Sequence, residues 1–549
     1  MVGSAVTPPR LRAALLGLLI LVAVFTFHAV RFAHYFNDDA YITFRYSRSL
    51  ASGHGPYFNP GEHVEGYTNP LLMLVLAGIY GLGGPGALPG AAKGIGIVAG
   101  AGALAVAFAL GRRLAAELEL PPGWRDAAGL SAALVLAASP GFAVNSVSGL
   151  ETAPFALLIA AGALAGVAAV EGRWRGSGLL FAAAYLMRPD GVVAFALFWV
   201  ARTAAGLARR ERPLIRPLFI DAAVVTAVVG LHLGARYVLY DHEWLPNTYY
   251  AKLGGDSERT GWQYVLDGAA IPFGGWALLL VGLCGLARTR GRAWTAVAPV
   301  VALAAGGTLL PAVLGADWMA GYRFLVHYLP VLAAVFGAGL AALAAMLPLR
   351  SRVAPGLAVA ATLALCWFAQ DGIRRTLWEA TRLRAVGYET GHRALASWLR
   401  AHAGPGETVA LMDIGLVGYD CPELRVLDLT GLTDRTIAKS PGTFLSKRYD
   451  PELVLGRKPE YIVLVLVAPG RSYAPPPGPL PLRPFTTGEA SIARDPEFQA
   501  RYARPRPAPE DADWHDAEAA RIGAERIFEH GHPGQYYLLA LYRRHEPVT

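Results

Sequence analysis

The chain has 549 residues, of which 54% are hydrophobic and only 16% are charged, and its formal net charge is +8. This composition excludes an ordinary soluble globular protein, because apolar runs typical of membrane spans recur through the first two thirds of the sequence. The positive charge comes from arginine clusters in short loops between these runs, which gives no support to a nucleic-acid-binding protein.

The first apolar run, near residues 11–30, follows a basic flank and ends without a small-residue cleavage site, which predicts a first membrane span. The loop at 34–69 comes directly after it and contains "FNDDAYITFRYSRSLASGHGPYFNPG". We expect a short helix near the start of this loop. One of Asp38 and Asp39 would cap that helix, and the other would be available for chemistry.

Further apolar segments follow, and their number can be tested by parity. A cytoplasmic N-terminus and a C-terminal region on the outside require an odd number of crossings. The segment at 70–83 is too short for a hydrocarbon core of about 30 Å at about 1.5 Å per residue, so we expect about eleven spans. The segments after the first lie near 70–83, 91–111, 127–144, 152–170, 177–187, 191–203, 217–237, 271–287, 294–312, 324–347 and 353–370.

Two kinds of loop alternate between these segments. Arginine-rich loops such as "ARRERPLIR", "RTRGR" and "LRSR" indicate the cytoplasmic side. Between them lie "NSVSGLETAP", "MRPDG", "LPNTYYAK" and "GADWMAGYRF", which we place outside together with the loop at 34–69. The expected architecture is a polytopic α-helical membrane domain over residues 1–372.

The composition changes after about residue 375. The stretch "GHRALASWLRAHAGPGETVALMDIGLVGYD" predicts an amphipathic helix, a Gly-Pro-Gly turn and a β-rich run. Four further strand candidates are "LRVLDLTGLTD", "YIVLVLV", "ERIFEH" and "YYLLALYRR". Residues 373–549 are therefore expected to form a soluble α/β domain on the outer side of the membrane.

The outward loops supply carboxylates and cations near span ends, and these groups could converge on one cavity at the outer membrane face. A carboxylate can take a proton from an acceptor hydroxyl, which makes Asp38 or Asp39 the candidate general base. Cationic side chains can hold a phosphate as it leaves; the candidates are Arg45, Arg188, Lys252 and Arg323. Candidate contacts to the sugar or the acceptor are Tyr41, Glu65, Glu151, Asp190, Asn247, Tyr250 and Asp317.

Several of these residues also have a purely structural interpretation. Glu151 could cap the helix that follows it, and Arg188 could form a local salt bridge with Asp190. Lys252 could be an anchor at the membrane interface beside two tyrosines, and Arg45 could pair with the nearby acids.

Five motifs occur in order: "DDAYITFRYSRSLASGHGPYFNPGEHVEGYTNPL", "SGLET", "LMRPDG", "LPNTYYAK" and "GADWMAGYRFLVHYLP". This set resembles bacterial GT-C glycosyltransferases, most closely the branch containing the mycobacterial terminal β-arabinofuranosyltransferase. The resemblance implies a polyprenyl-phosphate sugar donor used at the outer face of the cytoplasmic membrane. It also implies an acidic general base in the first external loop, which falls on Asp38 or Asp39. The expected activity is hexosyl or pentosyl transfer, with arabinofuranose the sugar that this branch suggests.

The expected reaction needs no cofactor. The acidic loops could hold a divalent metal, but the clustered cations make one unnecessary, and no Walker or HExxH motif occurs. The cysteines, Cys284, Cys366 and Cys421, show no paired spacing and predict neither a disulfide framework nor a zinc site.

The expected partners are the lipid-linked donor, membrane lipid and a glycan, glycolipid or protein acceptor. A transporter or flippase of lipid-linked sugars is the alternative function. It is less favoured, because the polar motifs gather on one face and the sequence shows no paired half-repeats.

Overall fold

The computed structural model describes residues 9–169, 173–253, 260–270, 276–287, 293–347, 353–469, 482–530 and 535–545. The chain divides into two compact units, and each is assembled from separate stretches of sequence. The first unit comprises Met1–Ala33, Pro89–Gly234 and Ser257–Leu377. The second comprises His34–Leu88, Ala235–Asp256 and Trp378–Thr549.

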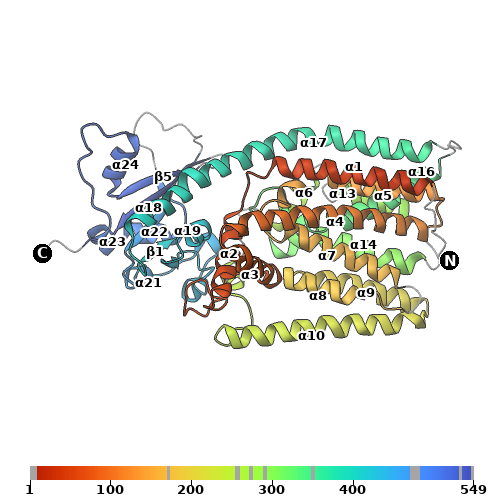
Figure 1. Cartoon of the computed structure of the whole chain (residues 1–549), viewed down its shortest axis with the longest axis horizontal. Helices are drawn as coiled ribbons and strands as arrows, with labels where there is room; N and C mark the ends of the chain where they lie inside the picture. The colour runs from red at the N-terminus through yellow and green to blue at the C-terminus, as the bar shows by residue number, and fades with distance from the viewer. Residues whose placement is uncertain are drawn as a thin grey trace. The chain divides into compact units, whose positions relative to one another are not determined.

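The first unit is built from apolar helices, most of which Figure 1 draws along a common direction. Helix α16 (Leu329–Ala345) packs on α5 (Pro122–Ala138) and on α13 (Trp276–Leu286). The other helices that begin or end in this unit are α1 (Pro9–Arg31), α4 (Ala87–Glu117), α6 (Pro140–Asn145), α7 (Thr152–Ala168), α8 (Ser177–Met187), α9 (Gly191–Ala208), η1 (Arg212–Leu214), α10 (Ile215–Leu239), α12 (Gly261–Ala270), α14 (Ala293–Leu314), α15 (Arg323–Val326) and α17 (Ala354–Gly387).

Within the described ranges, 5 helices are long and apolar enough to cross a membrane: α1, α4, α9, α10 and α14. Shorter apolar helices lie at Pro70–Gly83, Thr152–Ala168, Ser177–Met187, Leu329–Ala345 and Ala354–Ala364. The predicted polytopic helical membrane architecture is confirmed, whereas the count of about eleven crossings stays a prediction. Part of the expected segment at 271–287 (271–275) and the basic loops at 288–292 and 349–352 lie outside the described residues.

Two expected segments are each divided into two helices by a proline. In the segment at 127–144, Ser139 accepts a hydrogen bond from the backbone N–H of Phe142, and Pro140 begins α6. Proline lacks an N–H and is favoured in the first turn of a helix, and here Pro140 lies in the first turn of α6, just after α5 ends. The segment at 324–347 divides in the same way, into α15 and α16.

The second unit contains a mixed sheet with strand order β2-β1-β3-β6-β5, and β4 pairs with β3. Strand β1 (Thr408–Leu411) is parallel to β2 (Arg425–Asp428) and β3 (Tyr461–Pro469). Strand β6 (Gln535–Arg543) is antiparallel to β3 and to β5 (Arg526–His530). The four strand candidates named from the sequence are confirmed, whereas the two-residue β4 (Arg483–Pro484) was not predicted.

Helices and turns surround this sheet, and Figure 1 draws most of them in cyan and blue. Those contributed by the C-terminal stretch are η2 (Tyr388–Arg393), α18 (Ala394–His402), α19 (Ile414–Asp420), α20 (Arg435–Ala438), η3 (Phe444–Ser446), α21 (Glu452–Leu455), α22 (Thr487–Arg494), α23 (Pro496–Arg501) and α24 (Trp514–Ile522). The other stretches contribute α2 (Asp38–Ala51), α3 (Pro70–Gly83) and α11 (Asn247–Ala251).

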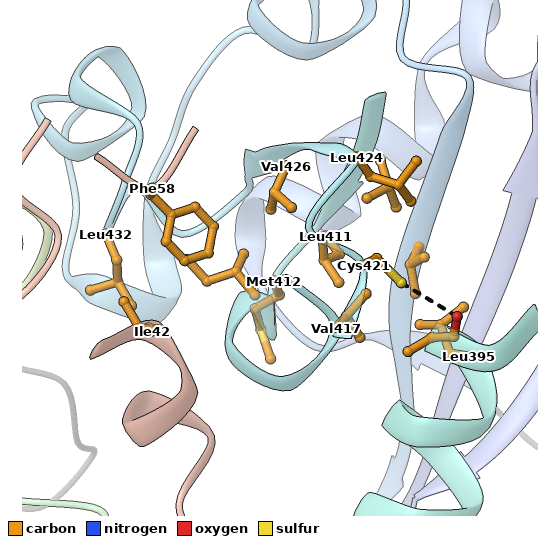
Figure 2. Packing of buried hydrophobic residues seen from close by; sticks show 14 of the residues in the cluster. Ile42, Phe58, Leu395, Leu411, Met412, Val417, Cys421, Leu424, Val426 and Leu432 are labelled. Atoms are coloured by element: carbon orange, nitrogen blue, oxygen red, sulfur yellow. Dashed lines mark hydrogen bonds between the residues drawn. The ribbon is translucent and has the colours of Figure 1, made fainter. Parts of the chain in front are cut away.

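The loop at 34–69 is part of the hydrophobic core of the second unit. Ile42 and Phe58 are buried in the same cluster as Leu411, Val426 and residues of α18 and α19. Figure 2 shows these side chains meeting beside the sheet. The compact units therefore differ from the expected domains, 1–372 and 373–549, and that division stays a prediction about folding.

Arg45 of α2 fastens the loop to the C-terminal part of the chain through backbone carbonyls. Its Nε donates to the carbonyl of Phe58 at 2.8 Å, and its Nη2 donates to that of Leu424 at 2.9 Å. Its Nη1 donates to the carbonyls of Gly418 and Cys421. These bonds compensate for burying the charge, because only 3% of the residue is exposed.

Asn59 covers the edge strand of the sheet. Its side-chain oxygen accepts from the N–H of Val426 at 3.0 Å, and its side-chain nitrogen donates to the carbonyl of the same residue at 2.8 Å. The loop thereby satisfies backbone groups of β2 that an open edge would leave for another chain.

We predict that Arg45→Ala destabilises the protein by at least about 3 kcal/mol. The substitution removes several hydrogen bonds to a charged group, each worth about 1.5–3 kcal/mol, and leaves buried carbonyls without donors. Thermal melting of the full chain in detergent measures the effect. Arg48→Ala is the matched control, because Arg48 lies one turn further along α2 and is partly exposed, and it should change stability by about 0.5 kcal/mol or less. Equal melting of the two variants would contradict this role of Arg45.

Candidate active site

The helix that carries the two adjacent acids begins with an asparagine cap. Asn37 is the N-cap of α2, and its side-chain oxygen accepts from the N–H of Asp39 at 3.1 Å. The prediction that Asp38 or Asp39 caps this helix is therefore wrong. The sequence contained the signal, since asparagine is among the best N-cap residues and immediately precedes the pair.

Asp38 points at the N-terminal end of α19. Its two carboxylate oxygens accept from the backbone N–H groups of Gly415 and Leu416, each at 2.8 Å. A Cβ atom at position 415 would lie 2.1 Å from the carbonyl oxygen of Asp38, so only glycine permits this approach. Burial raises the pKa of Asp38 to about 6.

A second carboxylate, Asp413, holds the turn just before α19. It accepts from the Tyr537 hydroxyl at 2.6 Å, and its Oδ2 lies 3.0 Å from His392 Nε2. Burial would raise the pKa of Asp413, but the bond and the charge of His392 outweigh it and lower that pKa. The sequence offered no signal that Asp413, His392 and Tyr537 lie together, because these residues are far apart along the chain.

Asp39 occupies a more open position beside a cation. Its side chain is 28% exposed, and its Oδ2 lies 4.0 Å from Lys252 Nζ. The ammonium group also lies 5.2 Å from the ring centroid of Phe444. The structure thus brings together a candidate base and a candidate phosphate-binding residue from two distant loops, and both remain accessible.

Two of the predicted site residues on α2, Arg45 and Tyr41, make contacts within the protein. The donors of Arg45 are directed at carbonyls and at Asn59 Oδ1, so we do not include this residue in the proposed site. Tyr41 is buried and lies against Tyr419, with ring centroids 5.7 Å apart. These contacts help to fix α2, and the ligand roles given to the two residues from the sequence stay predictions.

Three further candidates join loops of the second unit. Glu65 forms a buried ion pair with Arg236, a residue not singled out from the sequence. Asn247 donates to the carbonyls of Gly431 and Leu432 at 2.6 and 3.1 Å. The Tyr250 hydroxyl donates to Glu243 at 3.3 Å. These contacts give each of the three residues a structural role in linking parts of the second unit.

The first unit contains a separate charged cluster. Arg188 Nη1 lies 2.7 Å from Glu151 Oε1, and its Nη2 lies 3.0 Å from Asp190 Oδ2. Arg323 Nε lies 2.8 Å from Asp317 Oδ2. Glu151 makes no side-chain cap to α7, so its structural interpretation as a cap is not supported.

The two arginines of this cluster both act on Glu151. Burial by itself would raise the pKa of Glu151, but the charges of Arg188 and Arg323 outweigh that effect and lower it. All five predicted charged residues of the first unit thus belong to ion pairs, and two of the carboxylates, Glu151 and Asp317, are buried.

Two polar groups next to this cluster lack protein partners within the described ranges. His327 Nε2 and the Tyr328 hydroxyl are buried and make no hydrogen bond there. Leaving such a group without a partner costs about 1–3 kcal/mol, which favours a water or a ligand group at this place. Tyr328 was not predicted, although it lies in the motif "GADWMAGYRFLVHYLP".

Metal ligation finds no support among the described residues, where no group of three or more His, Cys, Asp or Glu is arranged to hold a metal ion. Each unit thus contains its own set of candidate groups: the Asp39–Lys252 pair in the second unit and the five-residue charged cluster in the first.

Comparison with known proteins shows the fold. Residues 377–522 match a family model described as "Domain of unknown function (DUF8728)". No curated protein matches the chain. The structure is similar to ArnT from Cupriavidus metallidurans bound to undecaprenyl phosphate, with a TM-score of 0.51 and 15% identity over 75% of this chain and 85% of that chain. The apo state of that protein gives a TM-score of 0.51 and 14% identity over 82% of this chain and 95% of that chain. The predicted GT-C-type fold is thereby confirmed.

We predict that the two acids of α2 differ in their effect on stability. In Asp38→Asn, the amide nitrogen replaces one oxygen and faces a backbone N–H, so the variant should lose about 1–3 kcal/mol. Asp39→Asn should change stability by about 0.5 kcal/mol or less, because Asp39 is partly exposed. Thermal melting in detergent compares the two variants directly. A larger loss for Asp39→Asn would contradict the assignment.

Proposed function

We propose that the protein is a membrane glycosyltransferase that moves one sugar from a polyprenyl-phosphate donor to an acceptor hydroxyl. The observation that carries this proposal is the Asp39–Lys252 pair, an accessible carboxylate beside an ammonium group. Its setting supports the proposal, because the fold is shared with a protein solved with undecaprenyl phosphate bound. The sequence motifs add arabinofuranose as the candidate sugar and a glycan, glycolipid or protein as the acceptor.

The proposed chemistry is a direct displacement at the anomeric carbon. Asp39 takes the proton of the acceptor hydroxyl, and the acceptor oxygen forms a bond to the anomeric carbon. The bond between that carbon and the phosphate oxygen breaks, and its electron pair leaves with the polyprenyl phosphate. Lys252 stabilises the charge that grows on the phosphate. A single displacement inverts the anomeric configuration.

Asp39 is the better candidate base because of what Asp38 already does. Both oxygens of Asp38 accept backbone hydrogen bonds from α19, whereas Asp39 is partly exposed and close to a cation. A general base must lie within hydrogen-bond distance of the proton that it removes, so a candidate is judged by its position first and by its pKa second.

We assign the charged cluster of the first unit, taken by itself, to binding of a sugar through its hydroxyl groups. Arg188 and Arg323 are paired with carboxylates, so the cluster offers a phosphate no net positive charge, and His327 and Tyr328 supply polar atoms with capacity for a further bond. Glu151, Asp190 and Asp317 hold the arginines and are suited to sugar hydroxyls.

The proposed location is the cytoplasmic membrane of a bacterium, with the loop at 34–69 and the C-terminal region on its outer face. This orientation rests on the alternation of arginine-rich and arginine-poor loops along the sequence.

We predict that Asp39→Asn lowers sugar transfer at least about a hundredfold, the lower range for loss of a general base, and leaves melting unchanged. The assay uses full-length protein in liposomes with a radiolabelled polyprenyl-phosphate sugar and a chemically defined acceptor. Asp38→Asn is the matched control and should retain transfer in proportion to its folded fraction. Transfer that survives in Asp39→Asn and disappears in well-folded Asp38→Asn would give the role to Asp38, whose acid limb would lie near pH 6. Donor movement across the bilayer without transfer would favour a flippase.

A further prediction concerns the phosphate. Lys252→Ala removes a charge-assisted hydrogen bond worth about 1.5–3 kcal/mol, which is about ten- to over a hundredfold in kcat/KM for the donor. Lys439→Ala is the control, because Lys439 is 45% exposed and already pairs with Glu243. Steady-state kinetics with varied donor separates the two variants. Equal kinetics would remove Lys252 from the site.

A further inference from the structure

A cleft of about 510 Å³ opens on the second unit beside the edge strand β2. We refer to it as the β2 cleft. Its charged and polar lining includes Glu62, His63, Asp241, Arg425, Arg435 and Arg457. None of these residues has a part in the reaction described above, although Glu62 and His63 belong to the same loop as Asp39.

The charges that line the β2 cleft balance one another. Arg425 pairs with Glu62, and Arg457 pairs with Asp434. Arg435 lies 3.3 Å from Asp241. A phosphate or a polyanion would meet no net positive charge here and would have to displace a carboxylate partner. The arrangement therefore favours an uncharged ligand.

The side chains of these ion pairs are partly exposed, so a ligand in the cleft can contact them. Asp241 is 54% exposed, Arg425 is 60% exposed and Arg457 is 40% exposed. Carboxylates accept and guanidinium groups donate several hydrogen bonds in fixed planar geometry, which suits ligands with neighbouring hydroxyl groups. A cleft with both kinds of group can bind each hydroxyl as donor and as acceptor.

The walls of the β2 cleft are held in place by backbone contacts. Arg435 Nη2 donates to the carbonyl of His63 at 2.9 Å and to that of Tyr240 at 3.3 Å. The ring of His63 stacks on Tyr57, with centroids 4.4 Å apart and planes 10° apart. Such fixed polar and aromatic groups bind a ligand with little loss of side-chain freedom.

We propose that the β2 cleft binds an uncharged carbohydrate segment of the acceptor. This inference rests on the proposed function for its biological role, but the binding itself does not require transfer. It also names the acceptor class: a neutral glycan or the neutral glycan part of a glycolipid.

The test measures binding of neutral oligosaccharides to the full-length protein in detergent. The neutral probes are a hexa-arabinofuranoside and mannohexaose, and a galacturonic acid hexamer is the anionic probe. We expect at least one neutral probe to bind wild type, and Asp241→Ala and Arg457→Ala to weaken that binding at least about tenfold. Arg375→Ala is the matched control, because Arg375 is 77% exposed on α17 and should leave binding unchanged.

Three outcomes would overturn the proposal: no neutral probe binds wild type, only the anionic probe binds, or the Asp241 and Arg457 variants, once shown to melt like wild type, bind as wild type does. Kinetics then separate this inference from the proposed function. If both hold, the two variants raise KM for the acceptor and leave kcat at saturating acceptor unchanged. If neutral probes bind and no sugar is transferred, the carbohydrate cleft stands and the proposed transfer fails.

Discussion

The second unit depends on two opposite charges of α2 that contact the two ends of α19. Asp38 accepts from backbone N–H groups at the N-terminal end of α19, and Arg45 donates to the carbonyls of Gly418 and Cys421 at its C-terminal end. A helix carries partial positive charge at its N-terminus and partial negative charge at its C-terminus, so both contacts are favourable. Seven residues span about 10 Å in either helix, which matches the spacing of the two charges to the length of α19.

This arrangement explains why adjacent acids have different properties. Asp38 is held by α19, and the next residue on the helix surface is turned away by about 100°, toward Lys252. The two acids therefore have different surroundings although they are adjacent in the sequence. Elsewhere, charges singled out as ligand contacts are largely neutralised by the protein itself, as in the Glu65–Arg236 pair.

The sequence predicted most of the apolar helices and four strands, but not the short helices of the C-terminal region, and α19 (Ile414–Asp420) lies in the run that was expected to be β-rich. Apolar runs predicted the helices, and β-rich runs predicted β2, β3, β5 and β6, because both signals are local. The contact between Asp38 and Gly415 joins residues 377 positions apart, and no local pattern reveals it. Arg45 was predicted to bind phosphate because the local sequence does not reveal its distant partners. A buried arginine that donates to backbone carbonyls cannot be told from an accessible arginine by the sequence around it. Asn37 is different, since its capping role could have been predicted from its place before the helix.

We propose that this fold performs a single displacement at the anomeric carbon of a lipid-linked sugar phosphate. The most direct measurement is the NMR determination of anomeric configuration in the donor and in the product formed by the purified full-length protein, with polyprenyl phosphate quantified alongside. We expect inverted configuration, with one polyprenyl phosphate released for each sugar transferred. Retained configuration, or a donor that crosses the bilayer intact with no phosphate released, would contradict it.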